Sequence, residues 1–217
     1  ECSLDGGSRR SLRRVKRQVE KDGGTFELLS PAETTAAMDE LQSISDAWLE
    51  ERQTREKGFS LGRFDPRYLS RFPAGIVRVG GRIVAFANVW TSGGKAELSV
   101  DLMRYSSDAP DGAMEYLFIE LMLWGAQQGY EWFNLGMAPL SGMEAHALGP
   151  LWNRVNALVF RHAEHFYNFQ GLRQYKEKFD PVWGPRYLAA PGGLALPRVL
   201  TDLGALISGG LTGMVTK

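Results

Sequence analysis

The chain has 217 residues, of which 44% are hydrophobic and 23% charged, an ordinary globular composition that excludes disordered, collagen-like and membrane-embedded classes. Its formal net charge is zero, with 25 basic and 25 acidic residues, so any attraction for nucleic acid or an anionic membrane has to be local. The single cysteine, Cys2, excludes an internal disulfide framework and a cysteine-based metal site, and it favours a reducing, cytosolic setting.

A local source of positive charge lies at the N-terminus. Leu12, Val15 and Val19 recur at spacings of three and four, which predicts an amphipathic helix over residues 8–22 that ends at Gly23-Gly24. The basic residues around this apolar stripe are Arg9, Arg10, Arg13, Arg14, Lys16, Arg17 and Lys21. We expect residues 1–24 to form a basic connecting helix in a piece cut from a longer protein, because the chain begins at Glu1 without an initiator methionine.

A strand, a helix and a β-meander are predicted next. Thr25–Leu29 alternates like a strand, and Ser30-Pro31 with Glu33 predicts the start of a helix. Residues expected to point inward from this helix are Met38, Leu41, Ile44, Trp48 and Leu49. Glycine-rich turns then separate three β-rich runs, which predicts an antiparallel meander. The three runs are Gly75–Val79, Arg82–Thr91 and Ala96–Met103.

The second half alternates helices and strands. Residues 112–128 predict a strongly periodic helix, and Glu131–Leu135 a buried strand. Apolar spacing from Pro150 to Phe179 predicts a further helix, interrupted around Asn168–Gly171, and Arg186–Ala189 predicts a short closing strand. The tail, residues 191–217, is rich in Gly and Leu; we expect an interfacial helix there, too polar to span a bilayer.

This order of elements, across residues 25–190, is that of the GNAT acyltransferase fold: an α/β domain with helices on both faces of a mixed, largely antiparallel sheet. Fold order does not assign chemistry. Standard GNAT enzymes bind the coenzyme A pyrophosphate in a glycine-rich turn before the helix that follows the meander. Here the turn from Arg104 to Ala113 lacks that glycine spacing and carries Asp108 and Asp111. We therefore expect no coenzyme A, and no other cofactor.

Three motifs resemble the phosphatidylglycerol lysyl- and alanyltransferase family over roughly residues 60–190. They are Val100–Arg104 (VDLMR), Asn134–Gly142 (NLGMAPLSG) and Phe166–Tyr187, which holds FYNFQGLR and KEKF. The resemblance implies that this domain is the second of a tandem GNAT pair and follows a membrane-embedded flippase half. It also implies transfer of lysyl or alanyl from aminoacyl-tRNA to the glycerol hydroxyl of phosphatidylglycerol. This would occur at the cytoplasmic face of the bacterial membrane and confer resistance to cationic peptides.

Such a transfer needs a group that takes a proton and a group that stabilises an oxyanion. Asp101 and Arg104 lie three residues apart at a strand end, so a regular strand would place them on opposite faces. We expect Asp101 to bind the donor's amino group or act as base, and Arg104 to hold a phosphate or carbonyl oxygen. The alternative interpretation is a surface ion pair.

Two further residues complete the expected catalytic set. Glu164 lies on the helix face away from the apolar stripe and is either catalytic or merely solvated. Lys176 is spaced three and four residues from Phe179 and Leu172, so we expect it to point inward and require an anionic partner. Lys178, by contrast, is expected to face solvent. The expected substrate-binding residues are Asn134, Tyr167, Arg173 and Lys178.

Two other kinds of site are not expected. The histidines lack the spacing of metal ligands, and Ser141 lacks a nucleophile elbow, so direct transfer is predicted. The histidines are His146, His162 and His165. Two other hypotheses stay open: a transferase acting on peptidoglycan precursors, and a non-enzymatic RNA- or membrane-binding module built on the basic helix. The sequence does not decide which amino acid is transferred.

Overall fold

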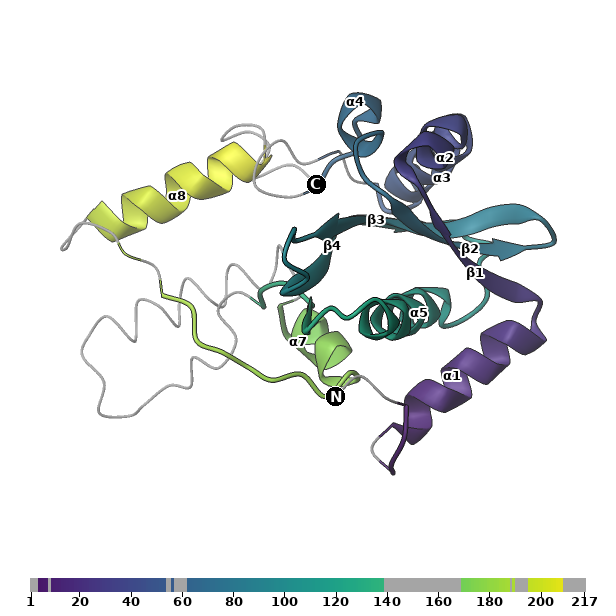
Figure 1. Ribbon diagram of the computed structural model, residues 1–217. Coiled ribbons are helices and arrows are strands. Elements are labelled where there is room, and N and C mark those ends of the chain that lie inside the picture. Colours follow the sequence, from purple (N-terminus) through teal and green to yellow (C-terminus); the bar gives the residue numbers. More distant parts are fainter. Residues whose placement is uncertain are drawn as a thin grey trace.

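The computed structural model describes residues 4–7, 9–53, 56, 62–138, 169–187, 189 and 195–208. Its centre is a five-stranded sheet in the order β1-β2-β3-β4-β5, antiparallel except for the parallel β4–β5 pair. Helices α2, α3 and α4 cover one face of the sheet, and α5 and α7 cover the other (Figure 1). The predicted mixed sheet with helices on both faces is therefore confirmed.

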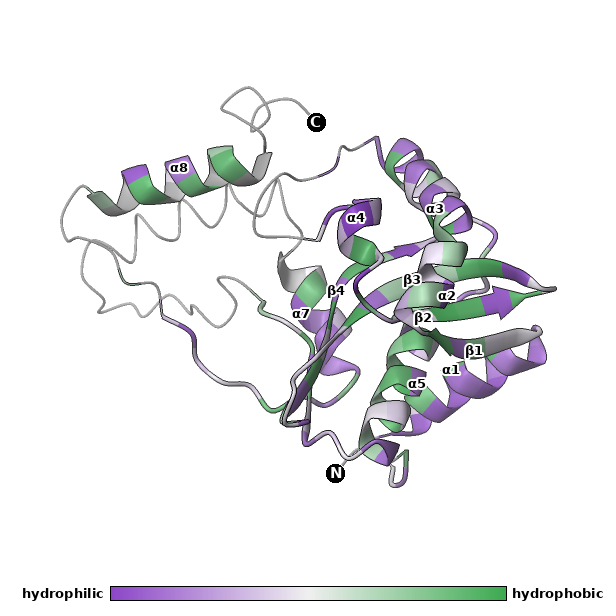
Figure 2. Cartoon of the chain, turned by 45° about the horizontal axis from the view of Figure 1, so that its top comes forward, coloured by the Kyte–Doolittle hydropathy of each residue, from purple (hydrophilic) through white to green (hydrophobic). Residues whose placement is uncertain are grey.

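Helix α1 (Arg10–Lys21) forms where the sequence predicts it. Leu12 and Val19 are buried, and the helix packs along α5. Gly23 then takes a left-handed conformation, with φ +84°, that a side chain would strain, and β1 (Gly24–Leu29) follows. Figure 2 shows that the outward face of α1 is hydrophilic, whereas α5 is largely hydrophobic.

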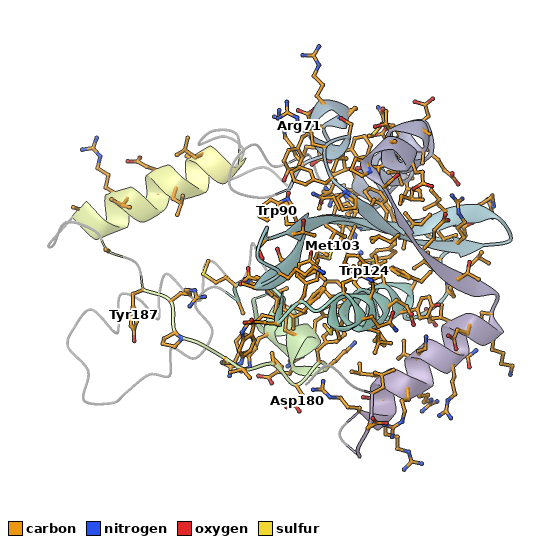
Figure 3. The ribbon with its side chains drawn as sticks, in the orientation of Figure 1. Arg71, Trp90, Met103, Trp124, Asp180 and Tyr187 are labelled. Carbon is orange, nitrogen blue, oxygen red and sulfur yellow. The ribbon has the colours of Figure 1, made fainter. Side chains whose placement is uncertain are left out.

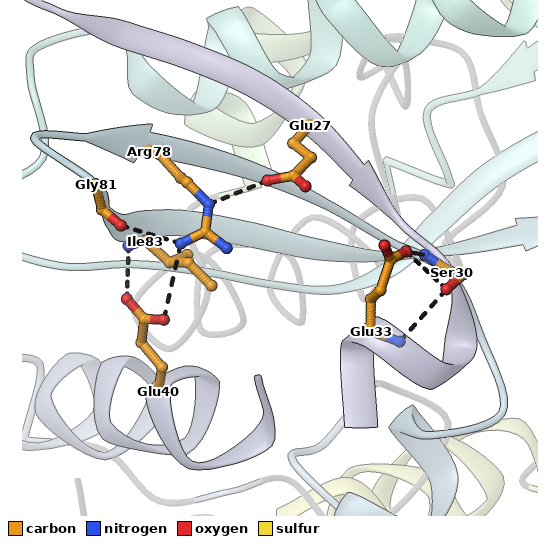
Figure 4. Close-up of polar contacts among 7 residues, drawn as sticks. All are labelled: Glu27, Ser30, Glu33, Glu40, Arg78, Gly81 and Ile83. Carbon is orange, nitrogen blue, oxygen red and sulfur yellow. Dashed lines mark hydrogen bonds and ion pairs between the residues drawn. The ribbon is translucent and has the colours of Figure 1, made fainter. Parts of the chain in front are cut away.

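The single helix expected after Ser30 is wrong, because the structure divides it at Ala37 into α2 (Pro31–Ala36) and α3 (Met38–Glu51). The Thr35 hydroxyl donates to the carbonyl of Pro31, a back-bond that bends helices, and β-branched threonines are poor helix formers. The predicted start is confirmed: Ser30 and Glu33 form a reciprocal capping box (Figure 4).

A network around Arg78 fastens this helical layer to the sheet (Figure 4). Arg78 donates to Glu27 on β1 at 3.0 Å and to the carbonyl of Gly81 at 3.1 Å. Glu40, on α3, lies 3.9 Å from the Arg78 guanidinium and accepts a hydrogen bond from the Ile83 amide at 2.7 Å. One arginine of β2 thus links β1, the turn between β2 and β3, and α3.

The predicted meander is confirmed as β2 (Ala74–Val79), β3 (Arg82–Thr91) and β4 (Glu97–Tyr105). Between β3 and β4 the register shifts, since Ala87 pairs with Met103 but Val89 pairs with Val100. Strand β4 therefore carries one extra residue, a β-bulge. The buried side chain of Asn88 accepts the Leu102 amide at 2.7 Å and so satisfies the interrupted ladder.

The predicted helix after the meander is α5 (Ala113–Gln127), and β5 (Trp132–Asn134) then pairs with β4. An unpredicted short helix, α4 (Pro66–Leu69), is capped by the Asp65 carboxylate, which accepts the amides of Arg67 and Tyr68. The last helix, α8 (Ala195–Ser208), stands apart from the sheet in both ribbon views (Figures 1 and 2).

Two predictions near the C-terminus need correction. Helix α7 (Phe169–Glu177) runs through Gly171, where an interruption was expected, because Tyr175 anchors it against Phe118 of α5. Asn168 and the helix expected from Pro150 lie outside the described residues. Residues 186, 187 and 189 form no strand; Tyr187 is 89% exposed, and the preceding Pro185 has no amide to donate.

Candidate active site

The β-bulge decides where Asp101 and Arg104 lie. A regular strand would separate them, but the extra residue in β4 lets both face the layer formed by α3 and α4. Contacts confirm this placement: Asp101 meets Tyr68 of α4, and Arg104 meets Trp48 of α3. Figure 3 shows the two sides of the sheet, with Trp90 on the α4 side and Met103 between the sheet and α5.

Asp101 is held by a short chain of hydrogen bonds. The Tyr68 hydroxyl donates to Oδ2 of Asp101 at 2.9 Å, and Nε1 of Trp90 donates to the Tyr68 oxygen at 2.9 Å. Burial and then the Asp101 carboxylate raise the pKa of Tyr68, so the phenol stays protonated and remains a donor. The carboxylate is thereby fixed in position.

Gly62 allows the chain to pass close to this carboxylate. A Cβ atom at Gly62 would lie 2.7 Å from the Leu102 amide nitrogen and 2.8 Å from the Asp101 carboxyl group. Side-chain atoms do not approach backbone this closely without displacement. Glycine at position 62 is therefore required for the observed approach to Asp101.

Arg104 is 9% exposed and lies over the Trp48 ring, with 4.2 Å from the guanidinium carbon to the ring centroid. It donates to both oxygens of Glu56 at 3.3 Å and to the Met103 carbonyl at 2.9 Å. Burial lowers the pKa of Arg104, and the Glu56 carboxylate opposes that effect. Arg104 thus forms its ion pair with Glu56. The alternative interpretation, a surface ion pair between Asp101 and Arg104, is wrong.

Lys176 points inward, as its spacing predicts, and is 6% exposed. Its Nζ donates to the carbonyl of Met137 at 2.8 Å. Among the described residues, the ammonium group bonds to this neutral carbonyl and not to the anionic partner that was predicted. Burial lowers the pKa of Lys176 from its ordinary 10.5 to about 8.

Asp101 and the partner of Lys176 lie at the same end of the β4–β5 pair. Pairing of the two strands stops at Ser99 and Asn134, and β4 continues to Tyr105 without β5 beside it. Asp101 follows Ser99 by two residues, and Met137 follows Asn134 by three. The Asp101 carboxylate and the carbonyl that holds Lys176 therefore both lie past the point where the parallel strands stop pairing, with Asp101 on the α4 side of the sheet.

Comparison with known proteins identifies the family. The family model for the C-terminal part of phosphatidylglycerol lysyltransferase matches residues 1–190. The chain belongs to this family. A phosphatidylglycerol lysyltransferase from Bacillus subtilis (strain 168) is 43% identical over 189 residues, which cover 86% of this chain and 22% of that protein. One from Staphylococcus aureus (strain MRSA252) is 37% identical, covering 87% and 22%. The chain spans about a fifth of the length of these relatives.

Two solved structures that resemble this chain have titles that name the same enzyme family. The C-terminal domain of a protein described as a lysylphosphatidylglycerol synthetase, from Agrobacterium fabrum, has a TM-score of 0.84 and 45% identity, covering 96% of this chain and 62% of that one. L-PGS from Bacillus licheniformis has a TM-score of 0.78 and 39% identity, covering 94% and 61%. The GNAT-like fold predicted from the order of elements is that of the phosphatidylglycerol lysyltransferase C-terminal domain.

Three other residues expected at the site are described, and each is engaged elsewhere. Asn134 donates to Glu97 at 3.0 Å and accepts the Gly136 amide at 2.7 Å, so it shapes the turn that presents the Met137 carbonyl. Arg173 pairs with Glu177 at 3.3 Å, and the exposed Lys178 pairs with Glu115 at 2.6 Å. Glu164 and Tyr167 lie outside the described residues, as do the three histidines and Ser141.

Sequence reasoning missed the residues that hold Asp101 and Arg104. Those residues are Tyr68 and Trp90 beside Asp101, Trp48 and Glu56 beside Arg104, and Gly62 and Asn88 beside the bulge at Leu102. Tyr68 and Asp101 are 33 residues apart and joined only through the fold. One available signal was the Asp65-Pro66 pair, a helix-start pattern that places Tyr68 on a short helix.

The start of α5 shows why a coenzyme A site is not expected there. A Cβ at Gly112, the residue before α5, would lie 2.8 Å from the side chain of Val15, so α1 packs directly on this helix start. Glu115 places a carboxylate in the first turn, where a bound anion would be repelled. Within the described ranges, no helix is long and apolar enough to cross a membrane, and no group of three potential ligands could hold a metal.

Proposed function

We propose that this chain is the catalytic domain of an enzyme that transfers an aminoacyl group from aminoacyl-tRNA to phosphatidylglycerol. The observation that carries the proposal is the Asp101 carboxylate, held by Tyr68 and Trp90 where β4 and β5 separate, in a chain of the phosphatidylglycerol lysyltransferase family. Transfer is direct: a glycerol oxygen attacks the ester carbonyl, and the tRNA 3′-terminal oxygen leaves with a proton.

Each polar group has a role in this reaction. Asp101 receives the donor's ammonium group or the proton of the glycerol hydroxyl. Arg104 and Lys176 supply positive charge from positions of low solvent exposure, where they act on developing negative charge more strongly than in water. Glu164 remains a proposed catalytic residue, and Asn134, Tyr167, Arg173 and Lys178 remain proposed substrate-binding residues.

The relatives favour lysine as the transferred group, since those from Bacillus subtilis and Staphylococcus aureus are named phosphatidylglycerol lysyltransferases. We place the domain at the cytoplasmic face of the membrane, as residues 25–190 between a connecting segment (1–24) and an interfacial tail (191–217). A preceding GNAT repeat and a transmembrane flippase half complete the protein. A lysylated lipid carries less negative charge, which would reduce attraction for cationic peptides.

Product identification tests this function. The full-length protein is incubated with labelled lysyl-tRNA or alanyl-tRNA, phosphatidylglycerol vesicles and, separately, a peptidoglycan precursor. We expect label to move from lysyl-tRNA to phosphatidylglycerol. Label on the peptidoglycan precursor alone would show that phosphatidylglycerol is not the acceptor. Label on neither acceptor, with intact donor recovered, would contradict the proposed transfer activity.

A further inference from the structure

A buried amide, Asn88 on β3, lies behind the candidate active site and is 1% exposed. The register shift between β3 and β4 places Asn88 opposite two residues of β4, Asp101 and Leu102. Oδ1 of Asn88 accepts the Leu102 amide at 2.7 Å. That amide belongs to the peptide unit that joins Asp101 to Leu102. The hydrogen bond therefore fixes the backbone from which the Asp101 carboxylate projects.

The other half of the Asn88 side chain is a donor that this bond does not use. The Leu102 N–H needs an acceptor, so Oδ1 has to face Leu102 and Nδ2 points elsewhere. Among the described residues, the buried Nδ2 has no hydrogen-bond partner. A buried donor without an acceptor lowers stability, and the Leu102 amide requires only an oxygen. Support of the bulge therefore does not account for the amide nitrogen of Asn88.

The Tyr68 hydroxyl offers the matching acceptor. It donates its proton to Oδ2 of Asp101 at 2.9 Å, and its oxygen accepts Nε1 of Trp90 at 2.9 Å. A hydroxyl oxygen can accept a second hydrogen bond. Burial and then the Asp101 carboxylate raise the pKa of Tyr68, whereas donation from Trp90 and Asn88 opposes them. Nδ2 of Asn88 thus faces the Tyr68 oxygen without reaching full hydrogen-bond geometry.

Two donors at one hydroxyl oxygen decide where its proton points. The indole N–H of Trp90 and the Nδ2 group of Asn88 can only donate, so neither can receive the Tyr68 proton. The O–H of Tyr68 is therefore directed toward Asp101, where the hydrogen bond is observed. Asn88 thus acts on Asp101 twice, once through the backbone at Leu102 and once through Tyr68.

We propose that Asn88 is a positioning residue for the transfer reaction, an inference that rests on the proposed role of Asp101 in aminoacyl transfer. Through Oδ1 it holds the backbone of the bulge, and through Nδ2 it orients the Tyr68 hydroxyl toward the carboxylate. A displacement of about 1 Å at a reacting group can cost a hundredfold in rate. A buried residue that contacts no substrate can therefore still set the transfer rate.

The kinetic test compares Asn88→Ala, Tyr68→Phe and the double variant in the full-length protein. We expect each single change to lower kcat/KM at least about tenfold, through the same constant, kcat or KM, that Asp101→Asn changes. Because Asn88 acts in part through Tyr68, the double variant should lose clearly less than the product of the two single losses. The matched control is Thr34→Val. It removes a buried hydroxyl on α2 that also lacks a hydrogen-bond partner within the described residues, and it should keep the parent rate.

Crystal structures of the 217-residue chain and of its Asn88→Ala variant test the arrangement without turnover. We expect the Tyr68 oxygen to lie 2.9 Å from Oδ2 of Asp101 in the parent. In the variant it should lie beyond about 3.5 Å, outside hydrogen-bond distance. Unchanged positions of Tyr68 and Asp101 overturn the proposal, as do single losses that multiply fully in the double variant. If the parent transfers no aminoacyl group, the proposed function fails, and the two structures still decide whether Asn88 positions Asp101.

A more conservative change is available if Asn88→Ala does not fold. Asn88→Asp keeps an oxygen for the Leu102 amide, but its ionised carboxylate has no N–H for Tyr68 and competes with Asp101 for the Tyr68 proton. The same loss in kcat/KM is expected. A parent-like kcat/KM in either Asn88 variant overturns the proposal.

Discussion

At the scale of single residues, Lys176 combines burial with a lowered pKa. If its charge serves the reaction, the transfer rate should fall as pH rises through about 8, where the ammonium loses its proton. Lys176→Arg, if it keeps activity, should extend the rate to higher pH because arginine stays charged. Initial rates against pH check this. Lys178→Ala is the comparison variant and should lose less activity than Lys176→Ala, since that exposed lysine pairs with Glu115 at the surface. A larger loss in Lys178→Ala would reverse this ranking.

The same residue has a measurable effect on stability. The folded pKa of about 8 lies below the ordinary 10.5, so between these values the unfolded chain binds more protons and the free energy of unfolding rises with pH. At pH 7 the folded state bears the full cost of burying the ammonium. We expect Lys176→Met to raise the free energy of unfolding by about 1 kcal/mol, which shifts Tm by roughly 2–4 °C. A lower Tm at pH 7 would contradict this.

Gly62 makes a steric prediction. In Gly62→Ala the new methyl group would meet the Leu102 amide and the Asp101 carboxyl, so the segment has to move. We expect a loss of about 1–3 kcal/mol in stability and at least tenfold in transfer rate. Gly93→Ala, where no atom lies within 4 Å of the added Cβ, is the matched control. Unfolding by denaturant and a transfer assay measure both effects, and a fully active Gly62→Ala protein would show that the close approach is unimportant.

At the scale of elements, the strands of the meander could be predicted from β-rich runs between glycine turns, and α5 from its helical spacing, because these are local signals. The bulge in β4 could not, since one extra residue leaves the apolar pattern nearly unchanged while it moves Asp101 to the other face. The break at Ala37 depends on a threonine back-bond, and the neutral partner of Lys176 depends on a turn 39 residues away.

The start of α5 carries the prediction about coenzyme A. Val15 packs on Gly112, and Glu115 stands in the first turn, so backbone amides there do not present an open anion site. Titration of acetyl-CoA by calorimetry should show no saturable heat at micromolar concentrations. Saturable binding would mean that the chain is an unusual acetyltransferase and that Asp101 has another role.

At the scale of the whole molecule, the charges are unevenly distributed although the net charge is zero. Carboxylates and cations meet in pairs on the body of the fold, as for Arg104 with Glu56 and Arg78 with Glu27. Among the described residues, Arg10, Arg14, Arg17 and Lys21 on α1 are exposed and lie outside this pairing. Positive charge is therefore concentrated locally on α1 in a protein whose net charge is zero.

The role of Asp101 in lysyl transfer is tested most directly by comparing Asp101→Asn with Asp108→Asn in the full-length protein. Both changes remove one carboxylate near the end of β4, but Asp101 is held by Tyr68 in the site, whereas Asp108 pairs with Arg82 at the surface. Transfer of lysyl from lysyl-tRNA to phosphatidylglycerol should fall by roughly a hundredfold or more in Asp101→Asn. A rise in KM for the donor would assign Asp101 to the ammonium group, and a fall in kcat to proton transfer. Asp108→Asn should keep the parent rate. Equal transfer rates in the two variants would contradict a role for Asp101 in the reaction.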